Sequence, residues 1–305
     1  MRSIYDIKEN LHWIDILSPS PLDLQYLRQN YNFHSVILDE LLHLSSRGKV
    51  DRFEDDYLYI VFRIPVYDIK EKTSKCGEID LLITRNSLIT VHYQPLQPIE
   101  EFERKLKNKK LIEEINDTAR LTYQFLEEVN QFSLHQLQRI QEKVNQVGEQ
   151  LFAKHQQDLL ERISWIKRDL VTIGMIVQPQ LRILESLLSV CSDFWGKRAE
   201  VYFSDLLNDY GRVINLFESL KTTLSDFETT NAQLLNYKSN DVMKKFTVLA
   251  FLTFPLMLVV AIITIPTISE AIENWMGLNG FILLILGSVL TMGLLAYIFR
   301  KKDWM

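Results

Sequence analysis

A run of small, hydroxyl and soft apolar residues near the carboxyl end could line a path for ions. Projected at 100° per residue, one broad helical face collects Asn240, Met243, Thr247, Ala250, Phe254, Met257, Ala261 and Thr264, with Phe246 at its edge. On this candidate pore face the bulky side chains could gate by dewetting, and the asparagine and threonines could contact hydrated ions. Helix packing in bilayers uses the same residue types, so both interpretations stay open.

Two uncharged runs are long enough to cross a bilayer. Residues 246–269 and 274–299 contain no Asp, Glu, Lys, Arg or His. A helix that rises 1.5 Å per residue needs about 20 apolar residues to cross a hydrocarbon core about 30 Å thick. We therefore predict two transmembrane helices, 246–266 lining the pore and 280–299. The side opposite the pore face suits lipid or the second span; it carries Leu249, Leu252, Leu256, Val259, Ile262 and Ile263.

The distribution of basic residues predicts the orientation. Lys and Arg accumulate on the cytoplasmic side of membrane segments. Three lysines precede the first span, a basic tail at 300–305 follows the second, and the loop 267–279 has no Lys or Arg. Both termini are therefore expected in the cytoplasm. Glu270 and Glu273 in the outer loop could concentrate cations at the mouth of the pathway.

The first 98 residues are typical of a small cytoplasmic α/β domain. We expect a strand at 13–16, a turn at 18–21 that leads into a helix, a strand at 56–67, and a hairpin at 79–93 that turns at 85–87. A polar connection is expected at 70–77. The segment 99–197 has apolar residues at helical spacing, and we expect it to form several antiparallel helices broken mainly at Gly148, Gly174 and Pro179.

A long stalk helix should then continue into the membrane. Between Lys197 and Pro255 there is one glycine and no proline, so a helix from about Arg198 to Ile265 would be roughly 100 Å long. We assign 198–245 to the stalk and expect neighbouring helices or other subunits to bury its apolar residues. Two spans cannot enclose a hydrated path alone, so transport would require a symmetric homo-oligomer within the membrane lipids.

Composition and motifs exclude other classes of function. The 305 residues carry 34 Lys+Arg and 39 Asp+Glu, a net charge of −5, which gives no electrostatic footprint for nucleic acid. The sequence has no glycine-rich phosphate loop, nucleophile elbow or paired-histidine zinc motif. We expect neither an enzyme nor an organic cofactor.

Several segments resemble the CorA family of divalent-cation channels, best known for Mg2+ uptake. In the soluble part these are residues 13–16 (WIDI), 47–54 (RGKVDRFE) and 86–92 (NSLITVH). At the membrane end, residues 240–244 (NDVMK) resemble the signature before the first span, and 254–256 (FPL) resemble its proline. The resemblance covers nearly the whole chain. It implies a homopentamer in the inner membrane, with a cytoplasmic α/β domain, a long stalk helix that continues into the pore-lining span, and a second span outside it.

The resemblance also implies regulatory and transported ions. Family channels close when Mg2+ occupies acidic sites between neighbouring cytoplasmic domains, and Asp68 and Asp205 stand where the sensing aspartates are expected. Oxygen ligands suit a hard Mg2+ ion. The family's Gly-Met-Asn motif, which forms the outer selectivity ring, is missing: Thr264, Ile265 and Pro266 occupy its positions.

The missing motif leaves three hypotheses. The first is a CorA-like channel or transporter whose default ion is Mg2+. The second is a transporter of the same fold for Zn2+, Co2+ or Ni2+. The third is a non-conducting, membrane-anchored sensor or scaffold.

Overall fold

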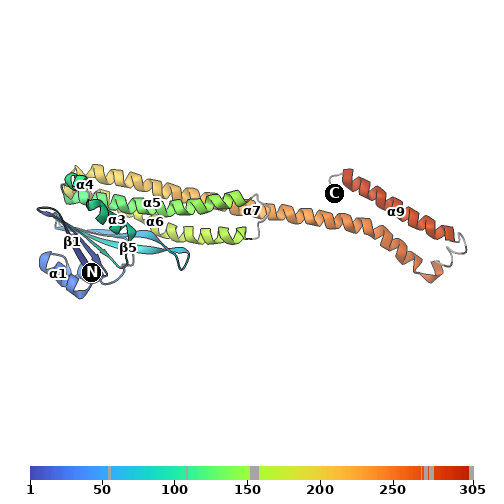
Figure 1. Ribbon diagram of the computed structural model, residues 1–305, viewed down its shortest axis with the longest axis horizontal. Helices are drawn as coiled ribbons and strands as arrows, with labels where there is room; N and C mark the ends of the chain where they lie inside the picture. Colours follow the sequence, from blue (N-terminus) through green and yellow to red (C-terminus); the bar gives the residue numbers. More distant parts are fainter. Residues whose placement is uncertain are drawn as a thin grey trace. The chain divides into compact units, whose positions relative to one another are not determined.

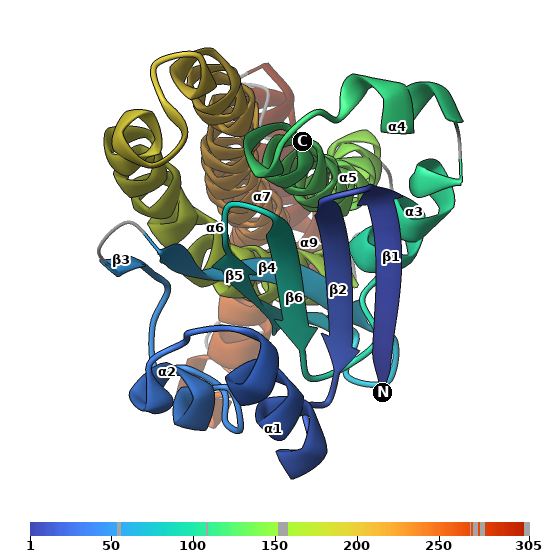
Figure 2. The same ribbon diagram turned by 90° about the vertical axis from the view of Figure 1, so that its left-hand side faces the viewer.

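The chain divides into two compact units, Met1–Glu228 and Thr229–Met305. The structure is a computed structural model that describes residues 1–53, 56–107, 109–151, 158–268, 270, 274 and 278–301. The first unit contains a sheet built from β1 (Arg2–Lys8), β2 (Leu11–Leu17), β3 (Lys49–Phe53), β4 (Tyr57–Asp68), β5 (Thr73–Ile83) and β6 (Ser87–His92). The order across it is β1-β2-β6-β5-β4-β3 (Figure 2).

The strands at the centre of the sheet are largely buried, and they pair as follows. β6 pairs with β2 in parallel and with β5 antiparallel, and β4 and β5 form a long antiparallel hairpin. The predicted strands at 13–16 and 56–67 and the hairpin with its turn at 85–87 are confirmed. The polar connection is shorter than expected, because β5 already begins at Thr73: ladder pairing with β4 overrides the polar composition of residues 73–77.

Two of the segments that resemble the family lie side by side in the sheet. Asp15 of β2 is in register with Thr90 of β6. The Thr90 hydroxyl donates to Asp15 Oδ1 at 2.6 Å and accepts from Trp13 Nε1 at 3.1 Å. His92 Nε2 lies 3.2 Å from Asp15 Oδ2. This hydrogen-bonded network joins the parallel pair of strands.

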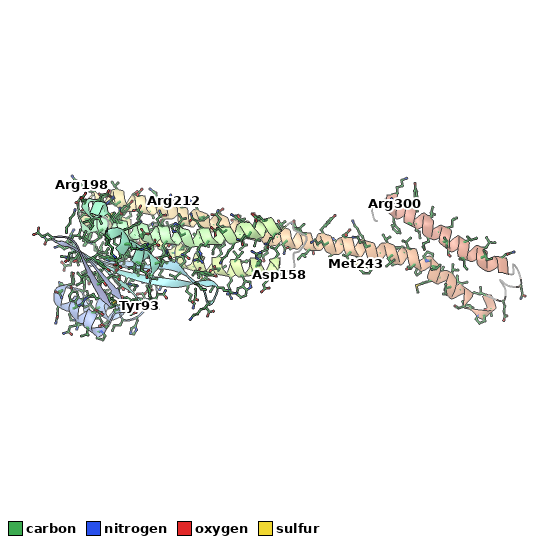
Figure 3. All side chains as sticks on the ribbon, in the orientation of Figure 1. Tyr93, Asp158, Arg198, Arg212, Met243 and Arg300 are labelled. Carbon is green, nitrogen blue, oxygen red and sulfur yellow. The ribbon has the colours of Figure 1, made fainter. Side chains whose placement is uncertain are left out.

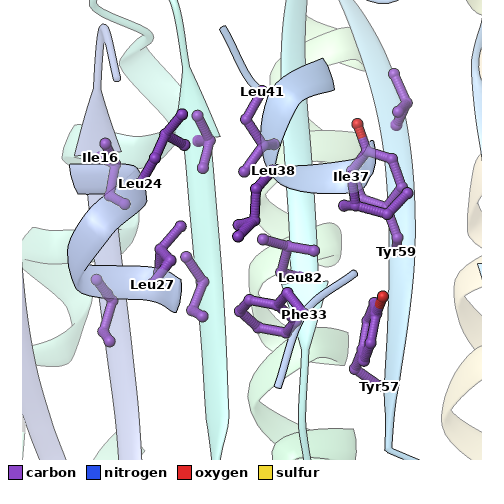
Figure 4. Close-up of a cluster of buried hydrophobic side chains, with 14 residues drawn as sticks. Ile16, Leu24, Leu27, Phe33, Ile37, Leu38, Leu41, Tyr57, Tyr59 and Leu82 are labelled. Carbon is purple, nitrogen blue, oxygen red and sulfur yellow. The ribbon is translucent and has the colours of Figure 1, made fainter. Parts of the chain in front are cut away.

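One face of the sheet is covered by α1 (Pro21–Asn30) and α2 (Ser35–Glu40) (Figure 2). The predicted turn before α1 is a capping box in which Ser20 and Asp23 satisfy each other's backbone N–H groups, and Pro21 is the first helical residue. Figure 4 shows the apolar cluster beneath these helices, where Leu27, Leu38 and Leu41 are fully buried. Burial of each such side chain stabilises the fold by about 1.5–3 kcal/mol.

Helices cover the opposite face of the sheet (Figures 1 and 2). α5 (Thr118–Leu151) and α6 (Leu159–Trp195) lie directly on the sheet. α3 (Gln97–Leu106) packs against α5, and the same helical layer contains α4 (Lys109–Glu114) and the first part of α7 (Ala199–Ile263). α5 and α6 both contact β4. The predicted helices after residue 98 and the long stalk helix, which is α7, are confirmed.

The breaks expected at Gly148 and Gly174 are wrong. Gly148 lies inside α5 and Gly174 inside α6. A Cβ at Gly148 would meet Phe227 Cζ at 2.9 Å, and one at Gly174 would meet Phe217 Cζ at 2.5 Å. These glycines let two phenylalanines of α7 pack directly on the backbones of α5 and α6, and burial of those rings outweighs the low helix propensity of glycine.

The break expected at Pro179 is also wrong, because α6 passes through it. Proline removes one backbone donor from a helix. Side-chain donors bond to carbonyls in the same turn: Tyr210 Oη donates to the Val177 carbonyl at 2.8 Å, and Gln180 Nε2 donates to the Ile176 carbonyl at 3.1 Å. Both side chains are buried, and these bonds stabilise the helix at the proline.

The second unit holds the rest of α7 together with α9 (Leu278–Lys301). Within the described residues one helix, spanning Ala199–Ile262, is long and apolar enough to cross a membrane. α9 includes the second predicted span, and its only charged side chains are Arg300 and Lys301 in the last turn.

Candidate ion pathway and cation-binding residues

The candidate pore face lies exposed on α7 in a single chain. Met243 and Phe254 are each 65% exposed and Met257 is 69% exposed; Figure 3 labels Met243. Thr247 is half-buried, and the remaining residues of the face are exposed: Asn240, Phe246, Ala250, Ala261 and Thr264. Large apolar side chains are thus left uncovered along the helix.

α9 packs on a different side of α7. The rings of Phe251 and Phe299 lie 6.0 Å apart between centroids. Val248 is only 3% exposed, and Leu252, Pro255 and Val259 are half-buried. At 100° per residue Val248, Leu252, Pro255 and Val259 lie on another side of the helix from the centre of the candidate pore face, and Phe251 lies between the two sides. Of the residues predicted to face lipid or the second span, Leu252 and Val259 are half-buried, whereas Leu249, Leu256 and Ile262 are exposed.

The two threonine hydroxyls of the face are bonded to their own helix, and its third polar group is the side-chain amide of Asn240. Thr247 Oγ1 donates to the Met243 carbonyl at 2.8 Å, and Thr264 Oγ1 donates to the Ala261 carbonyl at 2.7 Å. Each hydroxyl hydrogen is therefore used within the helix, whereas an oxygen lone pair stays available to a cation or to its water shell. The chemistry of the face is neutral oxygen contact between apolar constrictions.

The segment in place of Gly-Met-Asn lies directly after α7. Thr264 and Ile265 form a turn whose backbone N–H groups bond to Val260 and Ile262 carbonyls at 3.1 and 3.2 Å. Pro266 supplies a carbonyl but no side-chain amide. An asparagine ring cannot form here, so any contact with a passing ion falls to hydroxyl and carbonyl oxygens.

The acidic outer loop is described in part. Glu270 is exposed. Glu273 lies outside the described residues.

Asp68 already has a cationic partner in its own chain. Its Oδ2 lies 2.7 Å from Lys75 Nζ, and its Oδ1 accepts from the backbone N–H groups of Lys70 and Glu71 at 2.8 and 3.2 Å. The hydrogen bond from Lys75 and these backbone bonds lower the pKa of Asp68 to about 2. Asp68 is therefore ionised at neutral pH, and a metal ion would compete with Lys75 for it.

Asp205 has a neutral partner. The Tyr123 hydroxyl donates to Asp205 Oδ2 at 2.7 Å, and Asp205 is otherwise exposed on α7. Burial and this carboxylate raise the pKa of Tyr123. The phenol keeps its proton, so it orients one carboxylate oxygen and leaves the other to solvent or an ion.

Within the described part of one chain, no group of three or more His, Cys, Asp or Glu side chains is placed to hold a metal ion. Asp68 and Asp205 therefore do not form a complete site in a single chain. The partners Lys75 and Tyr123 were not anticipated from the sequence. Lys75 follows from the hairpin register, which puts it diagonally across from Asp68, but that register was not fixed by residues 70–77.

Residues 8–301 of the chain match a family model described as CorA-like Mg2+ transporter protein. The chain belongs to this family. It is a family of transporters, in agreement with the expectation that the chain is not an enzyme. A cobalt/magnesium transport protein CorA of Thermotoga maritima is 21% identical over 294 residues, which is 96% of this chain and 83% of the relative. The cobalt/magnesium transport protein CorA of Methanocaldococcus jannaschii is 22% identical over 96% of this chain and 91% of its own length.

Solved structures share the fold. The complete structure of the CorA magnesium transporter from Methanocaldococcus jannaschii matches with a TM-score of 0.80 at 21% identity, over 97% of this chain and 92% of that one. The ZntB cytoplasmic domain from Vibrio parahaemolyticus matches with a TM-score of 0.63 at 19% identity, over 75% of this chain and 90% of that one. The CorA-like fold class expected from the sequence is thus confirmed.

Proposed function

We propose that the chain is a passive divalent-cation channel of the inner membrane, assembled as a homopentamer, with the candidate pore face of α7 around the axis. The observation that carries this proposal is that the candidate pore face of α7 is uncharged and largely exposed, while the buried Val248 lies on another side of the helix. In a single chain that face has large apolar side chains uncovered, and a symmetric ring of copies would enclose it. Both termini are cytoplasmic in this proposal, following the distribution of lysine and arginine.

Mg2+ is the default ion, and the relatives named above are described as cobalt/magnesium transport proteins. Hydroxyl and carbonyl oxygens at the end of α7 are hard ligands, which favour Mg2+ over softer ions. Without an asparagine ring, the ions Zn2+, Co2+ and Ni2+ remain candidates to be compared directly.

We further propose that Asp68 and Asp205 bind regulatory Mg2+ with ligands from neighbouring copies. The carboxylate of Asp68 is ionised, and one oxygen of Asp205 faces solvent. Lys75 would have to leave Asp68 for a fully coordinated ion, so this chain should need more Mg2+ to close than one that lacks the lysine.

Ion flux into proteoliposomes tests the proposed activity. Purified oligomer, verified by mass in detergent, is reconstituted with an imposed inside-negative potential, and uptake of Mg2+, Zn2+, Co2+ and Ni2+ is compared with empty liposomes. We expect potential-driven uptake of at least one divalent ion, with Mg2+ carried. Absence of flux for all four ions in an intact oligomer would contradict the channel and favour the sensor or scaffold.

A further inference from the structure

Asp80 is a carboxyl group inside the apolar cluster between the sheet and α1/α2. It lies on β5 in register with Val61 of β4 and Val91 of β6, which are members of that cluster, and it is 0% exposed. The activity proposed above does not use it. An ionised carboxylate at such a position costs several kcal/mol unless it is paired.

If Asp80 is ionised, the Tyr93 hydroxyl has only acceptors around it and a single hydrogen to share among them. Tyr93 Oη lies 2.7 Å from Asp80 Oδ2, 3.0 Å from the His43 carbonyl and 3.3 Å from the Leu41 carbonyl. A phenol has one hydrogen, and all three neighbours are acceptors if Asp80 is charged. Asp80 Oδ1 has no hydrogen-bond partner in the described chain. A proton on Oδ2 resolves this arrangement: Asp80 donates to Tyr93, and Tyr93 donates to the His43 carbonyl.

The charges that face Asp80 do not neutralise it. Glu78 on its own strand and Glu40 on α2 are acidic, and Tyr59 and Tyr93 are neutral phenols. Lys49 on β3 is the facing cation, but its Nζ is held by Glu40 at 2.6 Å and Asp51 at 3.2 Å. The His43 side chain points to solvent, since the residue is exposed. Burial, with the Glu78 charge in addition, raises the pKa of Asp80 to about 7.

We propose that Asp80 is a proton-binding site and that its proton holds the segment Leu41–Ser45 on the sheet. When the proton leaves, the Tyr93 hydrogen turns to the Asp80 carboxylate, and the His43 carbonyl loses its donor. The carboxylate then draws solvent into its apolar surroundings. The proton moves between Asp80 and solvent, and no covalent bond other than O–H changes.

A series of hydrogen bonds connects the segment Leu41–Ser45 to α6. The Ser45 backbone N–H donates to Glu78 Oε1 at 2.6 Å, and Arg63 donates to Glu78 Oε2 at 3.1 Å and to the Ser45 carbonyl. The Arg63 backbone N–H donates to Gln180 Oε1 of α6 at 3.1 Å. Loss of the proton at Asp80 therefore weakens the attachment of residues 41–45 to the sheet, and these residues are connected to α6 through the hydrogen bonds just described.

Hydrogen exchange of the full-length protein in detergent tests this site. Protection of the peptide that contains residues 41–49 is measured at pH 6 and pH 8 and corrected for intrinsic exchange. Asp80 binds the proton more tightly when residues 41–45 are held on the sheet than when they have come away from it. Protection should therefore fall about tenfold between these pH values. In Asp80→Asn, a neutral side chain that can still donate to Tyr93, protection should stay high at both pH values. In Asp6→Asn, an exposed carboxyl on β1, the wild-type fall should remain.

Tyr93→Phe keeps the test decisive if Asp80→Asn does not fold. This variant removes the hydrogen that binds the His43 carbonyl, so protection should be low and independent of pH. The proposal is overturned if the wild type shows no fall, or if Asp80→Asn or Tyr93→Phe retains the same fall as the wild type.

Discussion

At the scale of the residue, the two candidate sensing aspartates differ in what an ion must displace. Asp68 would have to lose the ammonium of Lys75, whereas Asp205 keeps one oxygen that its hydrogen bond from Tyr123 does not use. An exposed ion pair of this kind contributes little to stability, and in the proposed site Lys75 would compete with Mg2+ for Asp68. Mg2+ affinity should therefore be set by Lys75 as much as by the two carboxylates.

Protease protection by Mg2+ measures that competition. Asp68→Asn combined with Asp205→Asn should abolish the protection of the cytoplasmic unit by Mg2+, while Lys75→Gln should give half-protection at a Mg2+ concentration several-fold lower than the wild type. Asp209→Asn, which removes a carboxylate paired with Arg212 on the same helix, serves as the matched control. Unchanged protection in the double variant would remove both aspartates from the regulatory site.

At the scale of the element, contacts between helices let α5 and α6 continue through glycines at which the sequence predicts breaks. The sequence predicted a helix from about Arg198 to Ile265, and α7 runs over Ala199–Ile263, because the stretch is poor in glycine and proline. Breaks at Gly148 and Gly174 could not be rejected from the sequence, since the phenylalanines that pack on these glycines lie far along the chain. Helix propensity correctly predicts a continuous helix where glycine and proline are rare. It wrongly predicts a break at a glycine that allows two helices to pack closely.

Gly174→Ala tests the close packing of α6 and α7. The new Cβ would overlap the ring of Phe217, so we expect destabilisation of about 1–3 kcal/mol, seen as a lower thermal unfolding midpoint of the full chain. In Gly211→Ala, where no atom lies within 4 Å of the added Cβ, stability should stay the same or rise by about 0.5–1 kcal/mol. Equal midpoints for Gly174→Ala and wild type would contradict the packing.

At the scale of the whole molecule, the sequence predicted the fold class, and it nominated the candidate pore face, but it did not predict the hydrogen bonds of Asp68 and Asp80. The candidate pore face follows from a period of 3.6 residues and from absent charges, which are local properties. The anchoring of Asp68 by Lys75 and of residues 41–45 by Tyr93 depends on strand register and loop path. Such contacts join residues that no periodicity relates.

The central claim is that ions pass along the Met257 side of α7. Met257→Cys and Leu256→Cys proteins in proteoliposomes are treated with a small, charged, water-soluble thiol reagent, and divalent-ion flux is measured before and after. Treated wild type controls for Cys76 and Cys191. We predict that flux through Met257→Cys is blocked and that flux through Leu256→Cys is unchanged. Block of Leu256→Cys with Met257→Cys unaffected would contradict the pathway.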